Sequence, residues 1–114
     1  MRDVLRGSII AAQIFLFSGT ALADCKLPPK APQMPQGATA SDEDMKHGRE
    51  ALQTYVNLLQ DYQKCMEAQI KNAPPDTKPE LKQQWQAEAD IAVDSAHEIA
   101  DIYSIQLRAF KARQ

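Results

Sequence analysis

The side chains best suited to bind a metal ion lie close together in the second half of the chain. Asp94 and His97 are three residues apart, and Asp90 and Asp101 lie four residues to either side of this pair. Spacings of three and four residues bring side chains to one face of a helix. Asp94-x-x-His97 is similar to half of the ligand set that helical bundles use for two-metal carboxylate sites. Asp94, His97 and Asp101 are therefore the candidate ligands for a metal ion.

A complete two-metal site also needs ligands from a facing helix. His47 and Glu50 are the available residues. In an antiparallel hairpin His47 would lie opposite about residue 103, which is roughly 9 Å along the helix axis from His97. We therefore predict no metal site and interpret the acids around His97 as a solvated helix face. Metal binding by Asp94, His97 and Asp101 is kept as an alternative function.

The residues that could act in catalysis form no recognisable grouping. The serines after the leader are Ser41, Ser95 and Ser104, and no histidine is positioned to activate any of them. No pair of carboxylates is singled out for acid–base chemistry. The sequence therefore predicts that the protein is not an enzyme and uses no cofactor.

The two cysteines, Cys25 and Cys65, allow three kinds of chemistry. Lipid attachment needs a small residue before the cysteine, but Asp24 stands before Cys25. A reactive thiol needs a neighbouring base or a C-x-x-C partner, and neither is present nearby. A disulfide between Cys25 and Cys65 is the third possibility and the one we predict, either within one chain or between two chains.

The N-terminal residues have the organisation of a cleavable signal peptide. Arg2 and Arg6 precede an apolar run over residues 8–23, and Ala21-Leu22-Ala23 is a small-x-small cleavage pattern. The alternative, a retained transmembrane anchor, is disfavoured because the run is short and a cleavage pattern ends it. We therefore predict a signal peptide over residues 1–23 and export to the periplasm or the extracellular space, where disulfides form.

A proline-rich arm over residues 24–40 follows the leader. Proline fixes φ and lacks an N–H donor, so the arm should run extended and not form a helix. Its composition alone would also suit a disordered linker. The prolines are Pro28, Pro29, Pro32 and Pro35.

Apolar residues at helical spacing predict a first long helix over about residues 41–73. Ser41 is suited to cap it and Asp44 lies at its third position, while Pro74 and Pro75 end it. Gly48 should weaken its first turns by about 1 kcal/mol relative to alanine. The apolar stripe consists of Met45, Leu52, Tyr55, Val56, Leu59, Tyr62, Met66 and Ile70.

A second long helix is predicted over about residues 78–112. Thr77 and Glu80 have the spacing of a capping box, with Pro79 tolerated in the first turn. Basic residues in the last turns suit the negative end of a helix. The apolar stripe is Leu81, Trp85, Ala89, Ala92, Ala96, Ile99, Tyr103, Leu107 and Phe110, and the basic residues are Arg108, Lys111 and Arg113.

Two such helices joined by a short proline turn predict an all-α fold, a long antiparallel two-helix hairpin over residues 41–114. Ile91, Ile102 and Ile105 lie on a face next to the stripe of the second helix and need cover from the arm, a second copy or a client. We favour cover by the arm together with a second copy, which would pair two hairpins into a four-helix bundle. Trp85, near the loop, could also anchor a partner if it is exposed.

The predicted disulfide fits the reach of these elements. From Ser41 to Cys65 a helix is about 36 Å long, and the residues from Cys25 to Ser41 span about 50 Å as polyproline. The arm can therefore double back along the first helix to Cys65, where its prolines would cover apolar surface.

The net charge of the chain after the leader argues against nucleic acid as a partner. Removing Arg2, Arg6 and Asp3 from the 13 basic and 15 acidic residues leaves 11 and 14, a net charge of −3. A chain of this balance has no basic surface for nucleic acid, and no segment after the leader is apolar enough to cross a membrane.

The stretches "DCKLPPKAPQMPQGATASDEDM", "YVNLLQDYQKC" and "LRAFKAR" resemble a family of small exported proteobacterial proteins with a Cys/Pro-rich N-terminus and a terminal RAFKA-like motif. The resemblance covers most of the chain after the leader. It implies export and this architecture, and it implies no activity.

These observations predict a non-enzymatic helical interaction or scaffold protein. The residues expected to contact a partner, or a second copy, are Trp85, Ile91, Ile102 and Ile105. The alternatives are the metal-binding protein described above and a chaperone-like holder of unfolded clients.

Overall fold

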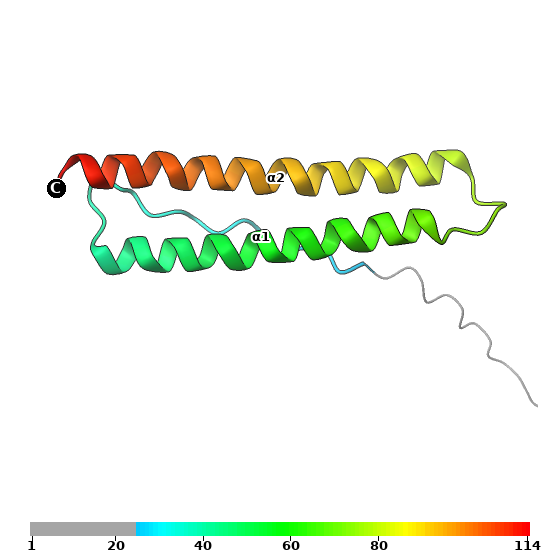
Figure 1. Ribbon diagram of the computed structural model, residues 1–114, viewed down its shortest axis with the longest axis horizontal. Coiled ribbons are helices and arrows are strands. Elements are labelled where there is room, and N and C mark those ends of the chain that lie inside the picture. The colour runs from blue at the N-terminus through cyan, green and yellow to red at the C-terminus, as the bar shows by residue number, and fades with distance from the viewer. Residues whose placement is uncertain (1–24) are drawn as a thin grey trace, which may run out of the picture.

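The computed structural model describes residues 25–114, so the predicted signal peptide over residues 1–23 lies outside the described part. Two helices, α1 (Asp42–Lys71) and α2 (Pro79–Ala112), run antiparallel and pack along their length (Figure 1). The predicted all-α hairpin is confirmed. The helix ends differ from the predicted ones by at most two residues, and α2 ends at residue 112 as predicted.

The start of α1 has the predicted cap. The Ser41 hydroxyl accepts a hydrogen bond from the Asp44 backbone N–H at 3.0 Å, and the Asp44 carboxylate accepts one from the Ser41 N–H at 3.1 Å. This pair is a reciprocal capping box that satisfies two helix-end donors. The hydrogen bond from the Ser41 backbone also lowers the pKa of Asp44.

The start of α2 differs from the prediction, because Thr77 does not cap it. The N-cap is Lys78, and no side chain makes a capping hydrogen bond there. Pro79 explains the shift: the residue before a proline is driven into extended backbone, and Lys78 has φ −66° and ψ 136°. Thr77 belongs instead to the loop, where its N–H donates to the Pro74 carbonyl at 3.0 Å.

The core is the seam between the two predicted stripes. Ala89 and Ala92 of α2 are buried in the seam. Aromatic residues pack on both sides of them, with Tyr62 and Trp85 toward the loop and Tyr103 and Phe110 toward the C-terminal end of α2. Leu81 is an exception at 40% exposure, in the first turn of α2 where the seam ends at the loop. The buried residues of the helices are Met45, Gly48, Tyr55, Leu59, Tyr62 and Met66 in α1, and Ala89, Ala92, Ile99, Tyr103 and Phe110 in α2.

Two tyrosines report the register of the hairpin. The Tyr103 hydroxyl donates to the Met45 carbonyl at 3.1 Å, and the Tyr62 hydroxyl donates to Glu88 at 2.5 Å. His47 is therefore close to the level of residue 103, as predicted, and far along the axis from His97.

The arm runs back along the hairpin, as the reach argument predicts. In Figure 1 its extended chain crosses α1 and continues toward the C-terminal end of α2, and Met34 and Ala40 belong to the core. The Cys25–Cys65 disulfide joins the beginning of the arm to α1 within one chain. The arm is therefore the third layer of the fold and not a linker.

Gly48 has a role that helix propensity does not reveal. A Cβ atom at this position would lie 2.5 Å from Cδ of Pro35, closer than real Cβ contacts allow. Because Gly48 has no side chain, the Pro35 ring can pack directly against α1 at this position. The helix-weakening glycine is thus part of the contact that docks the arm.

The arm ends in a turn that the C-terminal part of α2 holds. Gly37 donates its N–H to the Gln106 side-chain oxygen at 2.8 Å. The Arg113 guanidinium donates to the carbonyls of Gly37 and Ala40, each at 2.7 Å, and also lies over the Phe110 ring. From the sequence, Arg113 was expected only to interact with the negative end of its helix. In the structure its hydrogen bonds also hold the turn against α2.

The first half of the arm, unlike the turn, is not attached to the helices by hydrogen bonds. In the part of the chain that the structure describes, no hydrogen bond joins residues 26–35 to either helix. Of these residues only Met34 is buried. The disulfide is therefore the main attachment of the segment that precedes Met34.

Candidate functional site

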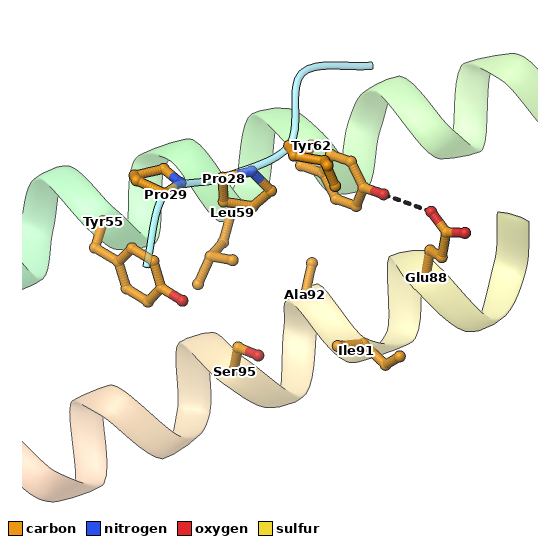
Figure 2. A pocket seen from close by; sticks show the side chains of 10 residues that line it. Pro28, Pro29, Tyr55, Leu59, Tyr62, Glu88, Ile91, Ala92 and Ser95 are labelled. Carbon is orange, nitrogen blue, oxygen red and sulfur yellow. Dashed lines mark hydrogen bonds between the residues drawn. The ribbon is translucent and has the colours of Figure 1, made fainter. Parts of the chain in front are cut away.

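A groove opens where the first half of the arm crosses the hairpin, and we call it the arm–α2 groove (Figure 2). Its volume is about 480 Å³. The arm forms one wall, α1 the floor and α2 the other wall. Its lining residues are Leu27, Pro28 and Pro29 of the arm, Tyr55, Leu59 and Tyr62 of α1, and Glu88, Ile91, Ala92 and Ser95 of α2.

The polar groups of the groove are few, and two of them are bonded to each other. Tyr62 of α1 donates its hydroxyl proton to Glu88 of α2, as the dashed line in Figure 2 marks. Gln84 donates to the second carboxylate oxygen of Glu88 at 3.3 Å. The rest of the lining is mainly apolar, so the groove offers contact area and no reactive grouping.

The Tyr62–Glu88 pair is expected to make the free energy of unfolding decrease at alkaline pH. Burial, and then the hydrogen bond to Glu88, raises the pKa of Tyr62 to about 12 from the ordinary value of 10.0. The unfolded chain loses this proton first, so the contribution of Tyr62 is complete below about pH 10 and is lost as the pH rises toward about 12. We expect the unfolding free energy of the wild type to fall more steeply over this range than that of Tyr62→Phe. Urea denaturation at a series of pH values measures the difference, and parallel curves for the two proteins would contradict it.

Next to the groove, α2 exposes three large apolar side chains, which we call the isoleucine face. Ile91, Ile102 and Ile105 are 62%, 40% and 53% exposed. Ile91 lines the arm–α2 groove as well, so the groove and the face form one surface. The arm, which was expected to help cover these residues, leaves them open to solvent because it packs along α1 and the seam.

Trp85 lies apart from that face. Its ring is half-buried and packs against the core cluster in the seam. Trp85 is therefore a packing residue near the loop. Leu27 and Leu58, which the sequence did not single out, are exposed instead, and Leu27 lines the groove at 74% exposure.

The metal-ligand candidates are not gathered into a site. Asp94, His97 and Asp101 are all exposed. Among residues 25–114, no three or more histidine, cysteine and acidic side chains lie close enough to hold a metal ion. The only ion pair between described residues joins His47 to Glu43 at 3.4 Å, one turn apart on α1.

The fold has no described helix that is both long enough and apolar enough to span a bilayer. Comparison of the chain with protein-family models, with curated proteins and with solved structures finds no match. Functional assignment therefore depends on the groove, the isoleucine face and the sequence.

Proposed function

We propose that this chain is an exported, non-enzymatic helical protein that binds a partner protein through the isoleucine face. One observation carries the proposal: Ile91, Ile102 and Ile105 stay exposed on α2 although the arm packs on the hairpin next to Ile91. Exposed apolar residues that are grouped on one surface typically mark a binding site. Their helix is fixed by a packed seam, so the face is preorganised for binding.

Export is supported by the sequence and by the disulfide. The leader has the charge, apolar run and small-residue pattern of a signal peptide, and cleavage would leave a chain that begins at Asp24. A disulfide between cysteines 40 residues apart suits an oxidising compartment, either the periplasm or the extracellular space. The resemblance to small exported proteobacterial proteins agrees with this location.

The alternatives receive no comparable support. A metal-binding function would need ligands that converge, and Asp94, His97 and Asp101 are spread along an exposed helix. A holder of unfolded clients would need a broad apolar surface, whereas the exposed isoleucines are three side chains on one helix. Binding of one defined partner fits the limited size of the face.

The proposal predicts that partner binding depends on the isoleucine face. Residues 24–114, oxidised and immobilised, would be used to capture proteins from the exported fraction of the native cells. A captured protein would then be purified and titrated against the wild type and against Ile102→Ser/Ile105→Ser. We expect at least a tenfold loss of affinity in the double variant, because each buried isoleucine contributes about 1.5–3 kcal/mol.

Leu58→Ser/Leu81→Ser is the matched control, since these leucines are also about 40% exposed but belong to α1 and to the first turn of α2, ten residues before Ile91. Its affinity should stay near that of the wild type. Equal binding by all three proteins, or the absence of any partner that rebinds after purification, would refute the proposal.

A further inference from the structure

We propose that the occupant of the isoleucine face is a cationic amphipathic helix of a partner protein. This inference rests on the proposed function and adds the chemistry of the partner. Three features of α2 support it: the apolar residues, the sign of the charges between them, and the length of the surface.

The charges on this part of α2 have a single sign. Between Lys82 and Arg108 the helix contains no lysine or arginine. None of its acids forms an ion pair with a described residue. The acids in this stretch are Glu88, Asp90, Asp94, Glu98 and Asp101, and all but Glu88 are exposed.

Helical spacing mixes these acids with the isoleucines. Glu98 is seven residues from both Ile91 and Ile105, so at about 100° per residue it lies on the same side of the helix as they do. Asp94 and Glu98 are one turn apart, and like charges at this spacing repel. A partner with lysines or arginines beside an apolar stripe would bury the isoleucines and relieve this repulsion.

No described lysine or arginine lies within ion-pair distance of these acids. Lys30 of the arm lies beside α1, where it lines a shallow groove with Glu50 and Leu58. Arg113 is engaged with the carbonyls of Gly37 and Ala40. The exposed acids beside the isoleucine face are thus free to pair with basic residues of a partner.

The dimensions suit a helix. From Ile91 to Ile105 the face is about 21 Å long, which four turns of a partner helix would cover. Such helix-in-groove recognition uses apolar anchors at helical spacing. The arm–α2 groove at the Ile91 end gives an anchor residue of the partner a place to insert.

A second copy of this chain is a poorer occupant. A twofold contact that pairs Ile91 with Ile105 would be centred on residue 98, and it would bring the two Glu98 carboxylates together. Anionic lipid and nucleic acid are disfavoured for the same electrostatic reason. The observations therefore favour a basic protein segment.

The test uses a synthetic probe, an 18-residue helical peptide with leucines on one face and lysines on the other. Its binding to oxidised residues 24–114 would be measured by fluorescence anisotropy. We expect saturable binding at one peptide per protein, and weaker binding as salt is added. The same residues in an order without an apolar stripe, and a version with glutamate in place of lysine, should each bind at least roughly tenfold more weakly.

Two pairs of substitutions test whether the peptide binds the isoleucine face or responds only to the net charge of the protein. Glu98→Gln/Asp101→Asn removes two charges from the face, whereas Asp61→Asn/Glu67→Gln removes two exposed charges from α1. We expect roughly a tenfold loss of peptide affinity in the first pair and little change in the second. Equal losses in both pairs, equal binding of the rearranged peptide, or peptide-free self-association through the face would overturn the inference. The capture experiment above still decides the proposed function, because it makes no assumption about the partner's charge.

Discussion

Replacing both cysteines with serine should lower the free energy of unfolding by about 4 kcal/mol, the loop-entropy value for a 40-residue separation. A two-helix hairpin buries one seam, so this is a large share of the stability of the domain. Urea denaturation of the oxidised wild type and of Cys25→Ser/Cys65→Ser, followed by circular dichroism, measures the loss. The wild type treated with a dithiol reductant should give the same curve as the double variant.

The structure also predicts which part of the chain becomes mobile when the disulfide is removed. Residues 26–33 should become fully mobile without the disulfide, because no hydrogen bond joins them to the helices. The turn over residues 37–40 should stay in place through its bonds to Gln106 and Arg113. Proteolysis confined to the first half of the arm is the expected pattern. A double variant as stable as the wild type would contradict the disulfide's role.

Gly37→Ala should cost about 3 kcal/mol, the upper part of the range for overpacking a close contact. Gly37 is buried against α2, where a Cβ atom would overlap the Gln106 carbonyl and lie 2.9 Å from the Phe110 backbone nitrogen. These are backbone atoms of a helix and cannot move aside. The turn would have to lift away, which breaks its hydrogen bonds to Gln106 and Arg113.

Ala38→Ser is the matched control for Gly37→Ala, because Ala38 is the exposed neighbour in the same turn. It should change the unfolding free energy by less than about 0.5 kcal/mol. Thermal and urea unfolding of both variants would give the comparison. If Gly37→Ala were as stable as the control, the turn would not dock on α2 as described.

Local pattern was enough to predict much of this fold. Apolar residues at spacings of three and four defined both helices, and Ser41 with Asp44 defined the start of α1. The Cys25–Cys65 disulfide was predicted because lipid attachment and a reactive thiol were disfavoured, and the extended arm is long enough to return to Cys65. These features depend on neighbouring residues or on simple lengths, which a sequence states directly.

The contacts that dock the arm could not be predicted, because they join segments far apart in sequence. From sequence alone, Gly48 is a residue that weakens a helix, and only the structure shows that Pro35 packs against it. Arg113 is likewise predicted only as a charge at a helix end, whereas the structure shows its hydrogen bond to the Gly37 carbonyl. At the start of α2, the pattern of Thr77 and Glu80 suggested a cap, but the backbone restriction imposed by Pro79 moved the cap to Lys78.

The candidate site was predicted in part. The sequence placed Ile91, Ile102 and Ile105 on a face that needs cover, and the structure shows that the arm does not supply it. Trp85 has helical spacing that fits the core, and it packs there. The arm–α2 groove was not foreseen, because it exists only where the arm crosses the hairpin.

The most direct test of partner binding by the isoleucine face is site-specific photo-crosslinking with the purified partner. A photoreactive phenylalanine would replace Ile105 on the face or Asn57 on the exposed side of α1. We predict a covalent adduct from position 105 and none from position 57. Adducts of equal yield from both positions, or an adduct from position 57 alone, would contradict binding through the isoleucine face.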